Sequence, residues 1–233
     1  MPFLSSIFSD TLQLFYPHIC TGCGSDLLQK DHLLCIACLT KLPHTGFARF
    51  AANPIEKYFW GRLHVTAAHS EFYFSKGELV QHLIHRLKYK NDTAIGACMG
   101  AILADTLLKS GRFSAIDGLV PLPLYPDKER KRGYNQATVI CNGMSPVMQV
   151  PVIDHIVIRQ RFTETQTRKH RTERWENVDQ SFAVANSTSL QGKHLLLVDD
   201  VVTTGATLEA CGSRILNIPG TRLSIATLAH APK

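Results

Sequence analysis

Two adjacent carboxylates, Asp199 and Asp200, follow an unbroken apolar run at residues 195–198. The run predicts a strand buried on both faces, as in a parallel sheet. Beyond it, residues 203–207 are Thr-Thr-Gly-Ala-Thr and lead into a helical apolar pattern. Ligands of open α/β sheets bind beyond the carboxyl ends of strands, where the free N–H groups of a helix N-terminus favour phosphate. The stretch therefore predicts a carboxylate pair and a phosphate-binding turn at one sheet edge.

A purely structural interpretation of this stretch is a buried strand followed by an N-capped helix. That interpretation accounts for the leucines and for one threonine. It does not account for two aspartates at a strand tip, because burial and mutual repulsion both disfavour their charged forms. A Walker A loop is excluded, because its lysine is missing and carboxylates precede the turn. We therefore favour the functional interpretation.

Two Cys-x-x-Cys pairs, Cys20 with Cys23 and Cys35 with Cys38, lie near the start of the chain. Two such pairs separated by a short loop match a tetrahedral four-thiolate zinc site. A redox dithiol and unreactive buried thiols are the alternatives. Four thiolates fill the coordination sphere, so we expect a structural zinc. The other cysteines lie on apolar helical patterns and are expected to be inert core residues: Cys98, Cys141 and Cys211.

Positive charge is concentrated in two segments. Residues 128–132, Lys-Glu-Arg-Lys-Arg, follow a predicted strand and would reach the same edge as Asp199 in a parallel sheet. The tract 159–177 is strongly basic and lacks an apolar stripe, which is typical of mobile lids in α/β enzymes. Solvated surface segments are the alternative for both. The net charge of +6 favours anionic partners such as phosphates, nucleotides or nucleic acid.

The remaining patterns supply the elements that must position these groups. Helical apolar spacing occurs at residues 3–16, 79–90, 92–111 and 135–144, the last of these ending before Pro146. Strands are expected at 116–122, 153–158, 181–185 and 222–228 around the central one, with a strand pair at 64–74 and a connector at 43–60. Alternating strands and helices predict an α/β fold with a mostly parallel sheet.

The cysteine count and the apolar segments bear on the compartment. An odd number of cysteines without a secretory signal favours reduced thiols and a cytoplasmic location. The apolar start has no preceding Lys or Arg and no Ala-x-Ala-like site, so we do not expect a signal peptide. No uninterrupted apolar run reaches the roughly 18 residues of a membrane span, so membrane insertion is not expected.

Residues 195–207 resemble the phosphoribosyl-pyrophosphate (PRPP) binding motif of type I phosphoribosyltransferases. Over nearly the whole chain, the order of motifs resembles the ComF/GntX family of phosphoribosyltransferase-like proteins, whose best-known members serve bacterial DNA uptake. The residues on which this resemblance rests are the cysteine pairs, residues 85–89, residues 120–136, the tract with Arg159, Thr163, Gln166, Arg174 and Asn177, and residues 199–207. The resemblance implies a helix plus zinc ribbon at 1–45 and a type I phosphoribosyltransferase fold at 46–233.

The resemblance also implies roles for individual residues. Asp199 and Asp200 would hold the ribose hydroxyls. The 5-phosphate would bind to Val202, Thr203, Thr204, Gly205, Ala206 and Thr207. The pyrophosphate side, with magnesium on the diphosphate, would involve Lys88, Tyr89, Arg130 and Arg132. The expected catalytic residues are Asp199, Asp200, Lys88 and Arg132, and the basic tract would close over the substrate. Two positions depart from the family pattern: Asn91 replaces a usual glycine and Tyr134 a commoner phenylalanine.

These implications lead to one main hypothesis and two alternatives. The main hypothesis is a PRPP-binding protein of the DNA-uptake class that handles single-stranded DNA and cooperates with the uptake machinery. The first alternative is an active phosphoribosyltransferase with an unknown nucleobase or amine acceptor, for which positioning and charge stabilisation matter more than a strong base. The second is a regulator that senses PRPP.

Overall fold

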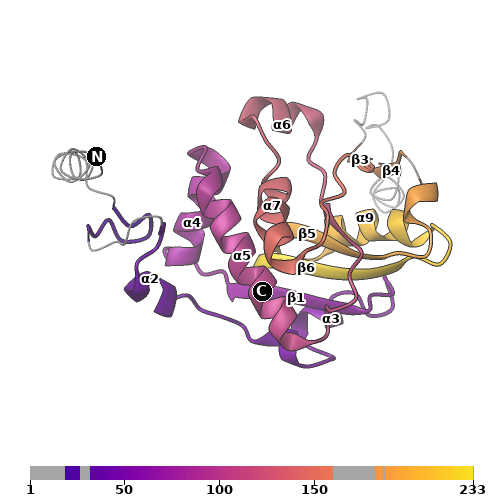
Figure 1. Cartoon of the computed structure of the whole chain (residues 1–233), viewed down its shortest axis with the longest axis horizontal. Coiled ribbons are helices and arrows are strands. Elements are labelled where there is room, and N and C mark those ends of the chain that lie inside the picture. Colours follow the sequence, from indigo (N-terminus) through magenta and orange to yellow (C-terminus); the bar gives the residue numbers. More distant parts are fainter. Residues whose placement is uncertain (1–18, 27–31, 160–181, 186, 233) are drawn as a thin grey trace, which may run out of the picture.

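The computed structural model describes residues 19–26, 32–159, 182–185 and 187–232. A four-stranded sheet with the order β1-β6-β5-β2 forms the centre, and all its neighbouring strands are parallel. The strands are β1 (Ala67–Tyr73), β2 (Gly118–Pro121), β5 (His194–Val202) and β6 (Arg222–His230). Figure 1 shows the helices arranged around this sheet. The predicted α/β architecture is confirmed, and the carboxyl ends of all four strands share one edge.

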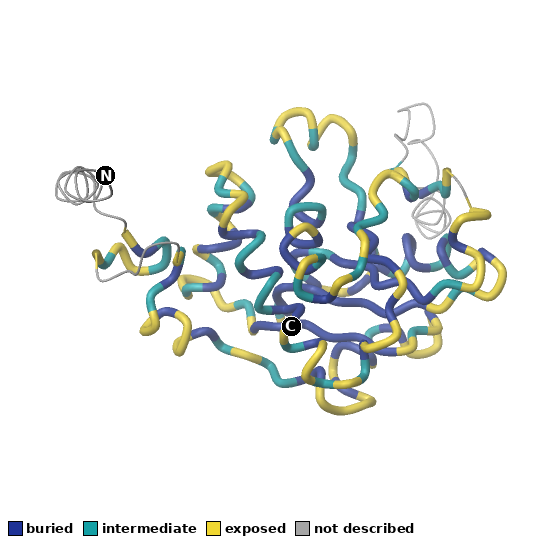
Figure 2. The backbone as a smooth tube through the Cα atoms, in the orientation of Figure 1, coloured by how far each residue is buried: buried dark blue, intermediate teal, exposed yellow. Residues whose placement is uncertain are grey.

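Helices cover both faces of the sheet. One face packs against α4 (Leu79–Tyr89), α5 (Thr93–Ser110) and α7 (Gln136–Met148), and the other against α3 (Pro54–Lys57) and α9 (Ala206–Leu216). In β5, Leu196 belongs to the first of these two cores and Leu197 to the second. Figure 2 shows the central strands almost entirely buried. The apolar run of β5 is thus explained by burial on both sides. Shorter elements are α2 (Ile36–Thr40), η1 (Phe47–Arg49), α6 (Pro126–Arg132) and η4 (Thr188–Leu190).

Glycines bring the backbones of α5 and α7 into direct contact. A Cβ added to Gly100 of α5 would lie 2.3 Å from the carbonyl oxygen of Ile140. A Cβ added to Gly143 of α7 would lie 2.0 Å from the carbonyl oxygen of Ala97. Both distances are shorter than any allowed contact, so only glycine permits this helix crossing. The two helices therefore form one rigid layer on the sheet.

Three of the expected elements differ in the structure. Residues 64–74 contain one strand, β1, and no strand pair, because no turn residue interrupts the segment. Strands β3 (Val157–Arg159) and β4 (Phe182–Val184) form a separate antiparallel ribbon instead of joining the sheet. At the outer edge of β2, which ends at Pro121, the described residues make one isolated bridge, between Leu119 and Val152. Neither Pro121 nor Pro123 has an N–H with which to extend a ladder there.

Two helices also differ from expectation. Helix α7 continues through Pro146 to Met148. The carbonyl that Pro146 leaves unpaired belongs to the exposed residue Asn142 near the helix end, where water can bind it. The basic residues 128–132 were expected in a loop and instead form helix α6, which begins with Pro126 in its first turn.

Among the described helices, α5 is long and apolar enough to cross a membrane, with a mean hydropathy of 1.2. Its residues Ile95, Met99, Leu103 and Leu107 are fully buried in the core shared with α7 and the sheet. That burial explains the composition of α5 as that of a core helix. Two predicted segments fall outside the described residues: the helix at 3–16 and, apart from Arg159, the basic tract 159–177.

Candidate functional site at the carboxyl edge of the sheet

Strand β5 directs Asp199 and Asp200 to opposite faces of the sheet, because successive side chains of a strand alternate. Asp200 shares the α4 face with Leu196, and its Oδ2 lies 2.7 Å from Nζ of Lys88. Asp199 shares the α9 face with Leu197. The backbone N–H of Asp200 donates to Oδ1 of Asp199 at 2.8 Å. The two carboxylates therefore lie on different sides of the strand, although they are adjacent in sequence.

The environment of Asp199 favours its protonated form. Burial raises the pKa of this carboxyl most, and the neighbouring Asp200 raises it further. The hydrogen bond from the Asp200 N–H and the charges of Lys88 and Arg159 act in the opposite direction but do not cancel the rise, which brings the pKa to about 8. Asp199 is therefore a group that exchanges its proton near neutral pH.

The predicted phosphate turn connects β5 to α9 and encloses a small cavity. This cavity has a volume of about 50 Å³ and is lined by Asp199 and residues 201–208. Gly205 has a φ of 76° and caps α9, whose first bond runs from the Glu209 N–H to the Gly205 carbonyl. An added Cβ on Gly205 would lie 3.1 Å from the Phe59 ring. The turn thus requires glycine here for both its backbone angle and its packing, and its size suits one phosphate group.

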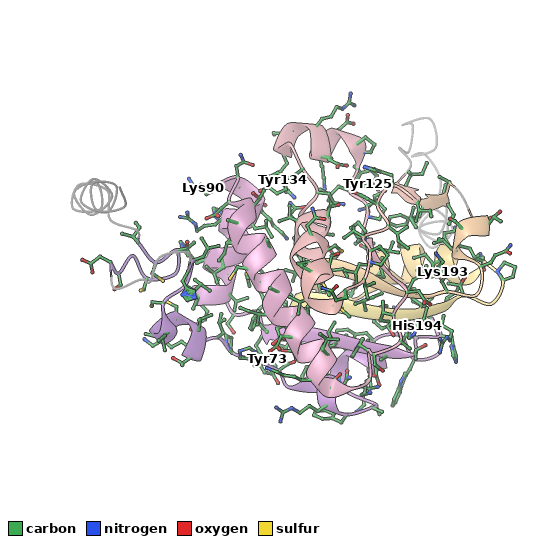
Figure 3. The ribbon with its side chains drawn as sticks, viewed as in Figure 1. Tyr73, Lys90, Tyr125, Tyr134, Lys193 and His194 are labelled. Atoms are coloured by element: carbon green, nitrogen blue, oxygen red, sulfur yellow. The ribbon has the colours of Figure 1, made fainter. Side chains whose placement is uncertain are left out.

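A larger cavity of about 450 Å³ lies between the end of α4 and helix α6. Its lining combines four cations with two phenol rings: Lys88, Lys128, Lys131 and Arg132, with Tyr89 and Tyr134. The guanidinium of Arg132 lies 5.8 Å from the centre of the Tyr89 ring. Figure 3 labels Tyr134 and Lys90, which lie at this end of the molecule. We call this cavity the basic cavity, and Lys88 joins it to Asp200 of the sheet.

The backbone around the basic cavity explains both departures from the family pattern. Asn91 has a positive φ of 55°, so asparagine serves where glycine is usual. The hydroxyl of Tyr134 donates a hydrogen bond to the carbonyl of Leu87, which ties the segment after α6 to α4. Tyrosine adds this bond, which phenylalanine lacks.

The structure brings Lys88, Tyr89 and Arg132 together but not Arg130. Arg130 is exposed and pairs with Asp127 at 2.6 Å along α6. Lys128 and Lys131 line the basic cavity and were not among the predicted site residues. Their spacing with Arg132 places all three on one face of a helix, so recognising Pro126 as a helix start would have identified them.

Arg159 is a second residue whose setting only the structure reveals. Its guanidinium lies 4.0 Å from the centre of the Tyr125 ring and 5.1 Å from that of Phe182. Its Nε is buried and has no hydrogen-bond partner among the described residues. Tyr125 is labelled in Figure 3. Two aromatic rings thus hold a positive charge that acts on the carboxyl of Asp199.

The four N-terminal cysteines converge on one point, with all four sulfur atoms within 4.8 Å of one another. The Sγ atoms of Cys20 and Cys38, and those of Cys23 and Cys35, are each 3.7 Å apart. A disulfide would need about 2.05 Å, whereas a tetrahedron with metal–sulfur bonds of about 2.3 Å has edges of about 3.8 Å. The arrangement therefore fits a tetrahedral metal ion.

The electrostatics of the cluster also suit a metal. Burial alone would raise the pKa of the Cys20 thiol, but the backbone N–H groups of Cys35, Cys23 and Gly22 outweigh it and lower that pKa to about 6. The thiolate is the form that binds metal. By contrast, Cys141 and Cys211 are fully buried in the core, and burial raises the pKa of both thiols.

The chain is similar to one known domain family and to several named bacterial proteins. Residues 135–233 match the phosphoribosyl transferase domain family. Competence protein F of Haemophilus influenzae is 25% identical over 218 residues, which cover 91% of this chain and 90% of that protein. DNA utilization protein YhgH of Escherichia coli is 27% identical over 201 residues, covering 85% and 78%. Competence protein ComFC of Bacillus subtilis is 28% identical over 141 residues, covering 58% and 53%.

These relatives agree with the architecture derived above. The matched domain begins at the N-cap of α7 and contains β5, the phosphate turn and β6. The cysteine cluster precedes this domain in the chain. The chain thus has a type I phosphoribosyltransferase-like fold preceded by a four-cysteine cluster that could hold a metal ion, and over most of its length it is similar to proteins named for competence and DNA utilization.

Proposed function

We propose that this protein binds PRPP across the carboxyl edge of the sheet. The observation that carries the proposal is the position of Asp199 on the wall of the phosphate turn, with the basic cavity beginning at Lys88 on the other side of β5. The 5-phosphate fits the turn, and Asp199 and Asp200 accept hydrogen bonds from the ribose hydroxyls. The diphosphate extends toward Lys88, Tyr89 and Arg132.

Magnesium belongs to the ligand in this proposal. When bound, it neutralises charge on the diphosphate and so lowers the cost of bringing that group to the protein. The protein's own residues do the remaining work. Lys88 pairs with Asp200 at 2.7 Å, the Arg132 guanidinium lies 5.8 Å from the centre of the Tyr89 ring, and both cations line the basic cavity, where they would stabilise charge on the diphosphate.

For the biological role we propose DNA uptake or utilization, through the handling of single-stranded DNA in the cytoplasm. Relatives named for competence and DNA utilization support this role. The basic cavity supports it independently, because backbone phosphates bind to cations and bases stack on exposed rings such as Tyr89, which is 66% exposed. The proposed partners are thus PRPP, single-stranded DNA and the uptake machinery.

Turnover of PRPP is the second candidate function. It is favoured by the raised pKa of Asp199, because a carboxyl that exchanges its proton near neutral pH can accept one from an attacking nucleophile. In such a reaction the bond from the anomeric carbon to pyrophosphate breaks, a bond to the nucleophile forms, and the nucleophile's proton is released. The acceptor class would be a nucleobase or an amine.

Titration calorimetry with PRPP and magnesium tests the binding proposal, and pyrophosphate release with candidate nucleophiles tests turnover. We expect saturable PRPP binding with one site per chain. Binding of PRPP no tighter than binding of free ribose would contradict the proposal. Release of pyrophosphate above the buffer rate would establish the enzyme, and its absence with nucleobase and amine acceptors alike would contradict turnover and leave a binding protein.

We further propose that the four cysteines hold a structural zinc ion in a module spanning residues 1–45, and that residues 46–233 form the PRPP-binding domain. Replacing Cys20 with Ser should release the metal, because three thiolates and a hydroxyl bind zinc far more weakly. Metal content by mass spectrometry of the native protein checks this result. Cys98→Ser is the matched control, because Cys98 lies on α5 away from the cluster. Unchanged zinc content in Cys20→Ser would exclude Cys20 as a ligand.

A further inference from the structure

Arg62 lies behind the phosphate turn and contacts it from the segment after α3. Its Nη2 donates to the carbonyl oxygen of Thr204 at 3.4 Å and to the carbonyl of Tyr58. Its Nη1 lies 2.8 Å from Oε2 of Glu209. One guanidinium thus joins the α3 segment, the turn and the first helical turn of α9. Sequence reasoning placed residues 43–60 in a connector and did not select Arg62.

The negative charge of Glu209 explains why its ion pair with Arg62 affects the binding of an anion in the turn. Glu209 lies in the first turn of α9, at the same helix end that encloses the phosphate-sized cavity. A carboxylate there stabilises the helix alone but repels a bound phosphate. Arg62 and Glu209 are 34% and 20% exposed, so solvent screens their charges only in part. Pairing with Arg62 cancels the repulsion from Glu209.

The contact with Thr204 acts on the orientation of the turn. A carbonyl oxygen that pointed into the cavity would oppose a phosphate, whereas N–H groups attract one. Arg62 holds the Thr204 carbonyl from outside the cavity that residues 201–208 line. Phe59, three residues earlier, supports the neighbouring Gly205. The segment between Tyr58 and Arg62 therefore supports the turn in its phosphate-binding geometry.

We infer that Arg62 is the positioning residue of the phosphate turn: it neutralises Glu209 and holds the Thr204 carbonyl, and so sets the affinity of the turn for a phosphate monoester. This inference rests on the proposed function of the turn. It makes no claim on the pyrophosphate side, which lies across β5 in the basic cavity.

Binding of ribose 5-phosphate and of pyrophosphate to the full-length protein tests the inference. Arg62→Gln should weaken ribose 5-phosphate binding about tenfold, the effect of one uncompensated charge at a helix N-terminus, and should leave pyrophosphate binding within twofold. Glu209→Gln in the Arg62→Gln background should recover at least half of the loss on a logarithmic scale. The loss should shrink in 0.5 M salt, because screening weakens the repulsion. Lys109→Gln, which breaks an exposed pair with Asp105 on α5, is the control.

The outcomes separate this inference from the function on which it rests. If the unmodified protein binds neither ribose 5-phosphate nor PRPP, the proposed function of the turn is wrong. If it binds both and Arg62→Gln binds them equally well, the role of Arg62 is wrong. Equal losses for ribose 5-phosphate and pyrophosphate would indicate a general structural defect and overturn the inference. The inference would also be overturned if the double variant, Arg62→Gln with Glu209→Gln, bound ribose 5-phosphate no more tightly than Arg62→Gln alone.

Discussion

The phosphate turn and the basic cavity are both suited to anions, but they are built in different ways. The turn is small, about 50 Å³, and the donors proposed for it are backbone N–H groups of contiguous residues around Gly205. The basic cavity has about 450 Å³ and uses long cationic side chains from α4 and α6. Backbone donors select by shape and geometry, whereas flexible cations attract phosphate of any origin and are screened by salt. The turn is thus suited to one specific group and the cavity to larger and more varied anions.

Asp199→Asn is expected to separate the two sites most strongly, by weakening PRPP binding and leaving binding of single-stranded DNA unchanged. Above pH 8, where Asp199 is ionised, loss of this charged acceptor for the ribose hydroxyls should weaken PRPP binding about a hundredfold, since a hydrogen bond to a charged group is worth about 1.5–3 kcal/mol. Binding of single-stranded DNA should stay within twofold. Calorimetry with PRPP and fluorescence anisotropy with an oligonucleotide measure the two. Asp105→Asn, an exposed acid on α5, is the matched control. A parallel loss of DNA binding would mean that the two anion sites are not independent.

The double variant Lys128→Gln with Lys131→Gln is expected to have a smaller effect, and on the other ligand: it should weaken binding of DNA and not of the phosphorylated sugar. Removing two phosphate contacts should weaken oligonucleotide binding several-fold and reduce the slope of log K against log salt by about 0.7 for each contact. Ribose 5-phosphate binding should not change, because these lysines line only the basic cavity. The matched control is the double variant Lys57→Gln with Lys109→Gln, which removes two positive charges from α3 and α5, outside the basic cavity. Equal slopes for the two double variants would show that net charge, and not the basic cavity, attracts DNA.

A third test of the comparison is a pH dependence of stability caused by Asp199. Its pKa rises from the model-compound value of 3.8 to about 8 on folding, so between these values the folded chain binds more protons than the unfolded chain. The free energy of unfolding should therefore fall as pH rises across this range. Asp199→Asn should lack this component and gain stability relative to the unmodified protein from pH 5.5 to pH 8. Urea unfolding at several pH values measures the difference, and a constant difference would refute the raised pKa.

The same contrast explains what could be predicted from the sequence. The turn, the carboxylate pair and the cysteine cluster consist of residues close in sequence, so their spacing alone identified them. The basic cavity joins residues 88–91 to residues 128–134, and these segments are brought together by the packing of α4 against α5 and of α5 against α7. The opposite orientation of Asp199 and Asp200 follows from strand alternation and could have been derived. The Arg159 stacking on Tyr125 and Phe182 could not, because it depends on how the β3–β4 ribbon is placed.

The glycine contact between α5 and α7 has a consequence far from where it occurs. Helix α5 starts just after Asn91 and α7 just after Tyr134, so each of these helices is connected in sequence to one wall of the basic cavity. The distance between these walls therefore depends on the close packing of α5 and α7, which requires that positions 100 and 143 carry no methyl group. An alanine at either position would act as a wedge, opening the gap between the two cationic walls without touching any residue in them.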